Sequence, residues 1–323
     1  MTNKNNSSKI KAPKLKLDFK ALLKGELGLV IILVALLVFF TMMSPYFLNM
    51  RNLLNISRQV SVTLIIAVGM TFVILIGEID LSVGSIAALV GVATAFTIIT
   101  SGSIVYGILA GAGVGLLVGL INGVLVVFGK VQSFIVTLAM LGIARGAALV
   151  WSDGKPISGL PLKFGEIGAG YVGNIPVSTI IAAVIFLIAF YFLRKTKHGL
   201  YTRSIGANRE AAKLSAIPVK KYRVVVFVIS GLMSAFGGIL IASKLLSGSP
   251  TAAEGMELNV IAAVILGGAS LSGGVGTALG TLLGAVVIGV INNGMNLIGV
   301  SSFFQEIVRG VIILVAVLAK RGE

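Results

Sequence analysis

The chain is a series of long apolar runs that polar residues interrupt at only a few places. A run of about 20 apolar residues is long enough to cross the hydrocarbon layer of a membrane as one α-helix. Each run of that length therefore predicts one membrane span, and together they predict about ten helices. The predicted spans are 27–44, 60–77, two within 81–129 broken near 100–103, 134–151, 177–193, 224–243, two segments within 258–305, and 303–319.

The segments between the spans are short and have distinct characters. Residues 44–59 are amphipathic, and we expect them to form a connection on the outer face. Residues 152–176 are polar and glycine-rich with few bases, which indicates an outer loop. The whole pattern predicts an all-α, polytopic membrane protein, with a transmembrane domain over 27–321.

Composition supports this class and excludes several kinds of site. Hydrophobic residues make up 57% of the chain and charged residues only 11%, a balance that a soluble domain does not need. Cysteine is absent, which excludes disulfides, thiol catalysis and cysteine metal sites. His198 is the one histidine, too few for a metal centre. We therefore expect neither a metal nor a cofactor on this chain.

The positive charge gathers in two places, the tail 1–26 and the segment 194–223. The second contains nine Lys/Arg residues against one acid, Glu210. Short basic loops between spans stay on the cytoplasmic side, so we expect the tail, this segment and, by the even helix count, the C-terminus to be cytoplasmic. The net charge of +15 could also indicate binding to nucleic acid, but retention of these basic segments on the cytoplasmic side explains it better. Binding to anionic lipid headgroups and docking of a cytoplasmic partner both remain open.

A short helix is predicted inside this basic segment. Asn208 is a suitable N-cap, Glu210 lies in the first turn, and Pro218 ends the helical pattern. The body between them is rich in alanine and carries Leu214. This apolar face favours a docking surface for a cytoplasmic partner.

Two apolar segments are interrupted in a similar way. Residues 73–84 and 264–274 each contain an apolar stretch broken by glycine and polar residues and followed by small residues. Paired broken segments indicate an internal two-fold repeat and a transport path, because the freed backbone groups must line protein or water. A chance recurrence of glycine-rich sequence is the alternative interpretation.

Few ionisable groups are predicted at membrane depth, where charge is costly and usually functional. Asp80 can cap the helix that follows it by accepting from the N–H groups of Ser82 and Val83, and direct contact with a substrate is the alternative. Glu306 and Arg309 are spaced to pair on one helix face. Glu78 and Arg145 complete the charged set.

The remaining polar groups at depth are neutral. Amides and hydroxyls suit a neutral polyol, and they serve equally well as hydrogen bonds between helices. The candidate residues of a substrate path are Asp80, Ser82, Ser85, Asn292, Asn293 and Asn296. No P-loop motif and no Ser/His/Asp set is present, so ATP binding by a P-loop and a nucleophilic membrane enzyme are excluded.

These motifs together resemble one transporter family. They are AVGMT at 67–71 running into GEIDLSVGS at 77–85, the GAN…EAAKLS segment at 206–215, PTA at 250–252 with EL at 257–258, IAAVILGG at 261–268 with LSGG at 271–274, and NNGMNLIGVSS at 292–302. From about 52 to 319 the chain resembles the ribose-type permease subunits of bacterial ABC importers for pentoses and related sugars.

The resemblance implies a homodimer in the bacterial inner membrane that imports a neutral sugar, D-ribose, by alternating access. It implies a separate ATPase with two nucleotide-binding halves, which holds the ATP and Mg²⁺, and an extracytoplasmic sugar-binding protein. The ATPase would dock on the segment around 208–215. The implied coupling residues are Gly206, Asn208, Glu210, Ala211, Ala212, Leu214 and Ser215.

The chain departs from the family pattern at three positions. Glu78 stands where the family usually has glycine, Ala216 replaces a glycine, and Asn259 replaces an aspartate. Xylose, arabinose, galactose, a furanose or an autoinducer sugar therefore remain alternative substrates. A proton-coupled carrier that uses Glu78 and Asp80 is an alternative from a different class.

Overall fold

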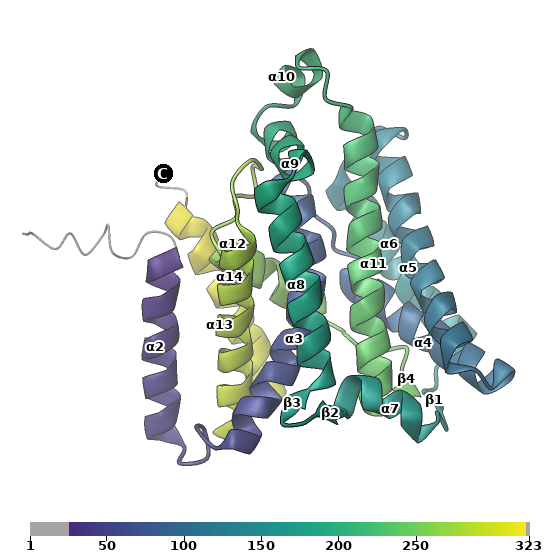
Figure 1. Cartoon of the computed structure of the whole chain (residues 1–323), viewed down its shortest axis with the longest axis vertical. Helices are drawn as coiled ribbons and strands as arrows, with labels where there is room; N and C mark the ends of the chain where they lie inside the picture. Colours follow the sequence, from purple (N-terminus) through teal and green to yellow (C-terminus); the bar gives the residue numbers. More distant parts are fainter. Residues whose placement is uncertain (1–25, 321–323) are drawn as a thin grey trace, which may run out of the picture.

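The computed structural model describes residues 26–320, so the predicted basic tail lies almost entirely outside the described residues. The described chain is a bundle of helices with two small strand pairs (Figure 1). The helices are α2 (Glu26–Met43), α3 (Met50–Leu75), α4 (Val83–Ser101), α5 (Ile104–Val127), α6 (Ser133–Trp151), α7 (Leu162–Ala169), α8 (Val177–Lys195), α9 (Lys197–Ala207), α10 (Arg209–Leu214), α11 (Val219–Leu245), α12 (Met256–Leu266), α13 (Ala278–Leu297) and α14 (Ser302–Lys320).

Within the described residues, eight helices are long and apolar enough to cross a membrane: α2 to α6, α8, α11 and α13. The shorter apolar helix α12 and the C-terminal helix α14 bring the number to the expected value of about ten. The prediction of an all-α, polytopic protein with broken helices is confirmed.

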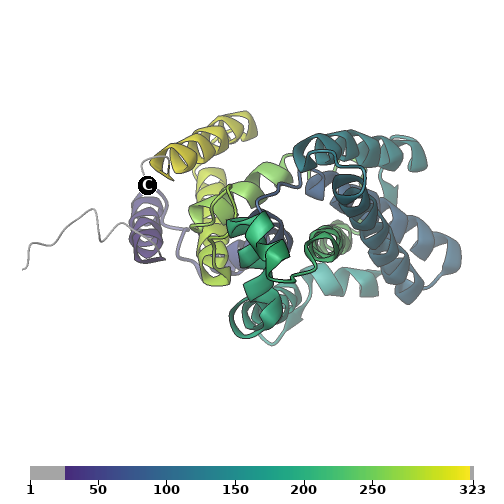
Figure 2. The same ribbon diagram turned by 90° about the horizontal axis from the view of Figure 1, so that it is seen from above.

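Helix α3 forms the centre of the bundle. It packs against α8, α11, α12 and α13, and its residues from Leu64 to Leu75 are all buried. Seen from above, the other helices surround it, with α2 and α14 at one edge and α4 to α6 at the other (Figure 2). A helix segment that is apolar on every side suits either the interior of a bundle or contact with lipid, and this part of α3 lies in the interior.

Close packing by small residues holds two helix pairs together. Gly115 and Gly119 of α5 approach α11 so closely that an added Cβ would lie 2.6 and 2.5 Å from the carbonyl oxygens of Gly231 and Phe227. Gly284 of α13 contacts the backbone of α12 in the same way. Only small residues allow such close approach, so these glycines set the spacing of both helix pairs.

Helices α9 and α10 project from one end of the bundle, called here the α10 end (Figure 1). The opposite end carries α7 and the strands. Strand β1 (Ile157–Ser158) pairs antiparallel with β4 (Ser247–Gly248), and β2 (Tyr171–Val172) pairs antiparallel with β3 (Ile175–Pro176).

Two predictions about connecting segments are wrong, and a third segment contains short elements that the sequence did not indicate. The amphipathic segment 44–59 is not a separate connection, because α3 already begins at Met50, capped by the Asn49 side chain. The polar loop 152–176 contains α7 and three of the strands. The basic segment 194–223 is largely helical, with the end of α8, α9, α10 and the start of α11, and Pro218 is the N-cap of α11 rather than the end of α10.

Candidate functional site

The projecting helix α10 begins where the sequence predicts. Asn208 has extended backbone angles (φ −157°, ψ 107°), and its side-chain oxygen accepts a hydrogen bond from the Ala211 N–H at 3.0 Å. Glu210 lies in the first turn and pairs with Lys213 at 2.6 Å. The polar cap separates α10 from α9 and turns the chain at this point.

The surface of α10 combines exposed apolar and polar groups. Leu214 is 91% exposed at its end, while Glu210, Ala211 and Ser215 are also exposed. Ala212 is buried and faces the protein. Ser215 donates from its hydroxyl to the Ala211 carbonyl at 3.0 Å, which closes the last turn. The predicted coupling residues from Asn208 to Ser215 therefore form one short helix with its two caps, and its Leu214 side chain is exposed.

Gly206, at the end of α9, lies where both helix breaks meet. An added Cβ would lie 1.9 Å from the Leu75 carbonyl oxygen, at the end of α3, and 2.4 Å from the Gly274 nitrogen, in the loop between α12 and α13. The Gly274 N–H donates to that same Leu75 carbonyl at 2.9 Å. Only a residue without a side chain fits between these two backbones. The two broken segments and α9 thus share one junction.

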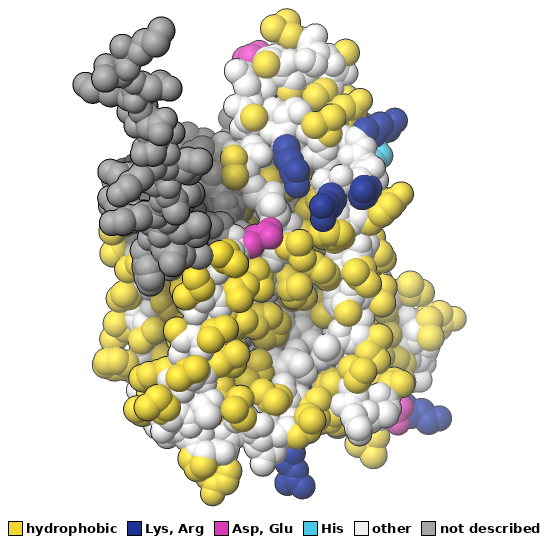
Figure 3. Space-filling view, turned by 60° about the vertical axis from the view of Figure 1, so that its left-hand side comes forward, with side chains coloured by type: hydrophobic (Ala, Val, Ile, Leu, Met, Phe, Trp, Pro, Cys, Tyr) yellow, Lys and Arg dark blue, Asp and Glu magenta, His cyan; other side chains and the backbone are white. Residues whose placement is uncertain are grey.

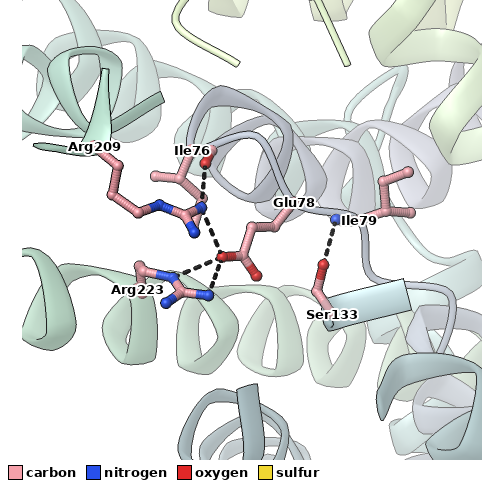
Figure 4. A network of polar contacts seen from close by, with 6 residues as sticks. All are labelled: Ile76, Glu78, Ile79, Ser133, Arg209 and Arg223. Atoms are coloured by element: carbon pink, nitrogen blue, oxygen red, sulfur yellow. Dashed lines mark hydrogen bonds and ion pairs between the residues drawn. The ribbon is translucent and has the colours of Figure 1, made fainter. Parts of the chain in front are cut away.

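Glu78 connects the first break to the helices on either side of Pro218 (Figure 4). Its buried carboxylate accepts from Arg223 Nε at 2.6 Å and Nη2 at 2.5 Å, and from Arg209 Nη2 at 3.1 Å. Arg209 also donates to the Ile76 carbonyl at 3.4 Å. A buried carboxylate is tolerated when it is paired and hydrogen-bonded in this way. The negative charge that Glu78 adds, where the family usually has glycine, is therefore balanced by Arg209 at the start of α10 and Arg223 near the start of α11.

The backbone of the same break is held from α6. Ser133 Oγ accepts from the Ile79 N–H at 3.4 Å, and the Thr137 hydroxyl donates to the Ile79 carbonyl at 3.3 Å. Backbone groups that leave a helix inside the bundle need such partners. The break is thus a defined structure rather than a loose loop.

The predicted cap at the start of α4 forms only in part: Asp80 binds the N–H of Ser82, the N-cap residue, and no bond from the Val83 N–H is found among the described residues. The Asp80 carboxylate accepts from the Ser82 N–H at 3.0 Å, the Ser82 hydroxyl at 2.5 Å and the Ser230 hydroxyl at 2.8 Å. Asn122 donates to the Ser82 hydroxyl oxygen at 2.9 Å, and the Ser85 hydroxyl donates to the Ser82 carbonyl. Asp80, Ser82 and Ser85 are all buried. They join α4, α5 and α11 at the first break.

The three asparagines of α13 lie elsewhere. They occur more than 13 residues after the start of α13, which places them roughly 20 Å along the helix from the end that follows the Gly274 loop. Asn293 accepts from Asn52 at 2.9 Å, and Asn296 accepts from Gln305 at 2.8 Å. The Asn292 side-chain oxygen is buried without a partner. The structure therefore separates the six path candidates into two groups at different heights in the bundle.

Arg145 supports a third non-helical stretch, residues 249–255. Its guanidinium donates to the Pro250 and Ala252 carbonyl oxygens, the second at 2.9 Å. Neither the sequence pattern nor the spacing indicates these partners. The predicted pair of Glu306 and Arg309 is wrong: within residues 26–320 no ion pair joins them, and Arg309 instead approaches Gly255.

Sequence reasoning missed the partners of Glu78. Arg209 and Arg223 are 131 and 145 residues away in the chain, and both belong to a segment whose charge is explained by topology alone. One signal could have found them: a buried acid in a neutral region needs a base, and the basic segment is the richest source.

Comparison with known proteins supports a transport function. Residues 52–317 match the family described as "Branched-chain amino acid transport system / permease component". The chain is 46% identical to ribose import permease protein RbsC of Haemophilus influenzae, over 90% of this chain and 91% of that protein. It is 44% identical to RbsC of Bacillus subtilis, over 92% and 93%.

A relative with a different named sugar is also similar. The L-arabinose ABC transporter permease protein AraH of Azospirillum brasilense is 39% identical, over 90% of this chain and 86% of that protein. No solved structure matches the chain. With the family match over most of its length and its apolar helices, the chain belongs to this family of membrane-spanning transport permease components.

Proposed function

We propose that the chain is the membrane-spanning permease subunit of an ATP-driven importer for D-ribose. Relatives named as ribose import permeases, 46% and 44% identical over nine-tenths of the chain, support the substrate. The observation that carries the mechanism is the shared junction at Gly206, where α9 touches both helix breaks. The α10 end faces the cytoplasm in this proposal, because its bases resist translocation.

A separate ATPase with two nucleotide-binding halves docks on α10. Leu214 offers an apolar anchor with 91% of its side chain exposed, and Glu210 and Lys213 surround it with polar groups. Apolar anchors with a polar rim are typical of protein interfaces. ATP and Mg²⁺ reside on that partner, and this chain binds no cofactor or metal of its own.

Movement of α10 reaches the breaks through two rigid connections. The first is the backbone contact of Gly206 with Leu75 and Gly274. The second is the ion-pair cluster of Glu78 with Arg209 and Arg223. A tightly packed contact transmits displacement because interiors are stiff. ATP binding by the partner would thus shift both broken segments at once and alternate the access of the path.

The path itself is assigned to the two groups of polar residues described above. Asn292, Asn293 and Asn296, far from the α10 end, form the part that a sugar meets first, and the unpartnered Asn292 oxygen is free to accept from a hydroxyl. Asp80, Ser82 and Ser85 shape the inner part by fixing the start of α4. A second copy of the chain completes the path, and an extracytoplasmic sugar-binding protein delivers the sugar.

The specific sugar has one alternative with support, L-arabinose, the substrate named for a relative 39% identical. A proton-coupled carrier finds less support. Glu78, its first candidate proton carrier, is already paired with two arginines that tie it to α10 and α11.

A double variant, Glu210→Lys with Leu214→Asp, tests the docking surface. We expect the ATPase to be lost on co-purification and ATP-dependent uptake to stop, while the permease remains in the membrane. Leu162→Asp with Glu166→Lys is the matched control, since these exposed residues have the same spacing on α7 at the opposite end. Retention of the ATPase by the first variant would refute docking on α10, as would its loss from the control.

A further inference from the structure

A groove runs between α8 and α11 below α9, apart from the polar site described above. Its volume is about 510 Å³, within the range of about 300–1,000 Å³ that ligand pockets occupy. Its walls include Ile185, Ile188 and Phe192 of α8 and Val225, Ile229 and Phe236 of α11, with α3 behind them. These walls carry almost no hydrogen-bonding groups, so the groove cannot be the path of a sugar.

The groove is open sideways, toward the surroundings of the bundle. Ile188, Phe192 and Val225 are 55%, 44% and 42% exposed along its edges. All three belong to helices that are long and apolar enough to cross a membrane. The medium in contact with this opening is therefore the acyl region of the bilayer.

Polar groups occur at one end of the groove only, the end below α9. There His198 Nδ1 and the Tyr222 hydroxyl lie 2.6 Å apart in a hydrogen bond. Phe192 and Tyr201 pack against this pair, with ring centroids 6.2 Å from His198 and 5.5 Å from Tyr222. Amphipathic aromatic rings of this kind gather at the level of lipid headgroups.

Exposed bases surround the same end. Helical spacing continues the groove-lining face of α8 from Phe192 to Lys195, and that of α11 from Val225 back to Lys221. Arg194, Lys197 and Lys220 are next to them in sequence. Among residues 26–320 none of these five forms an ion pair. Figure 3 shows lysine and arginine side chains gathered at this end of the molecule, above a largely hydrophobic surface.

We propose that this groove binds one anionic phospholipid, with an acyl chain between α8 and α11 and its phosphate beside Lys195, Lys221 and the His198–Tyr222 pair. The α11 wall from Tyr222 to Phe236 extends about 21 Å at 1.5 Å per residue. One leaflet of the hydrocarbon layer is about 15 Å deep. The wall is therefore long enough to hold an acyl chain over the whole leaflet.

This site has a consequence for the coupling helices. His198 and Thr202 belong to α9, and the groove also contacts α3 at Phe72, close to the end of α3 that meets Gly206. A bound lipid fills the space beneath α9 and fixes α9 relative to α8 and α11. The inference does not depend on which sugar is carried.

Native mass spectrometry of the full-length protein, released from nanodiscs that contain either phosphatidylglycerol or phosphatidylcholine, tests the proposal. We expect retained phosphatidylglycerol and little phosphatidylcholine. Lys195→Gln with Lys221→Gln should weaken phosphatidylglycerol binding by about tenfold or more, since each base near an anionic surface contributes roughly fivefold. Ala189→Phe, which fills the groove, should abolish retention without changing any charge.

Lys155→Gln with Lys163→Gln, two exposed lysines at the opposite end, is the control with the same loss of charge. Equal retention of both lipids by the wild type would overturn the proposal. Unchanged retention of phosphatidylglycerol by either the charge variant or the groove variant would also overturn it, because the site needs both the bases and the groove. The control pair must retain the lipid as the wild type does.

Discussion

The Glu78 carboxylate and the Arg223 guanidinium form a two-bond ion pair, at 2.6 and 2.5 Å, across 145 positions of the sequence. Glu78 is 4% exposed and Arg223 15%, so the pair is largely shielded from water. It ties the break after α3 to the first turns of α11, and Arg209 adds a tie to α10. Any displacement of the docking helix must therefore move the break or disrupt this cluster.

Glu78→Gln should lower the stability of the protein and its transport rate. The substitution leaves two arginines near a neutral amide, and breaking a shielded ion pair costs about 1–3 kcal/mol. Thermal unfolding in detergent measures the first effect, as a lower Tm. Glu210→Gln, which breaks the exposed pair with Lys213, is the control and should leave the Tm nearly unchanged. Equal shifts for the two variants would contradict a special role of Glu78.

Gly206→Ala should impair transport more than any other single methyl group added nearby. Its Cβ would overlap the Leu75 carbonyl, and overpacking of this kind costs about 1–3 kcal/mol. Because α9 must move away from one or both breaks, uptake should fall more than the amount of protein in the membrane. Gly142→Ala on α6, where a Cβ meets nothing within 4 Å, is the matched control. Normal uptake by Gly206→Ala would exclude the junction from coupling.

Features specified by neighbouring residues were predictable from the sequence. The Asn208 cap and the turn near Gly102 each depend on a few adjacent residues, and the structure has both; of the two N–H groups predicted to bind Asp80, it has the one from Ser82. The lengths of the apolar runs also predicted the approximate number of membrane-level helices, because the thickness of the bilayer fixes the length of a span.

Features that depend on distant partners were not predictable. Glu78 indicates that a base must lie nearby, but no neighbouring residue identifies Arg209 or Arg223, and nothing near Arg145 indicates the carbonyls of Pro250 and Ala252. Helix α9 was missed because its bases suggested a loop, whereas burial of Ile205 and Thr202 against the bundle supports a helix. Tertiary contacts of this kind override local pattern.

Asp80→Ala should destabilise the protein without a selective effect on sugar affinity. Removing the carboxylate leaves the Ser82 N–H and the hydroxyls of Ser82 and Ser230 without their shared acceptor, a loss of about 2–4 kcal/mol. Asp80→Asn keeps one acceptor oxygen, so its stability should lie between that of the wild type and that of Asp80→Ala. The KM for uptake, measured on the protein that remains folded, should change little. A large rise in KM with an unchanged Tm would instead show that Asp80 contacts the sugar.

Arg145→Met should loosen residues 249–255 while leaving α6 intact. The Pro250 and Ala252 carbonyls lose their donor, and carbonyl oxygens inside an apolar bundle need one. Hydrogen exchange of this segment should accelerate about tenfold or more, the equivalent of about 1.4 kcal/mol. Arg145→Lys, which can still reach one carbonyl, should give a smaller change. No acceleration in Arg145→Met would mean that other contacts hold the segment.

The most direct test of the account is uptake of labelled ribose by cells that contain this chain, its ATPase and its sugar-binding protein, with each subunit omitted in turn. We predict uptake only when all three are present, and little effect of an uncoupler that collapses the proton gradient. Uptake by this chain alone, or uptake that stops with the uncoupler while ATP is maintained, would contradict an ATP-driven importer.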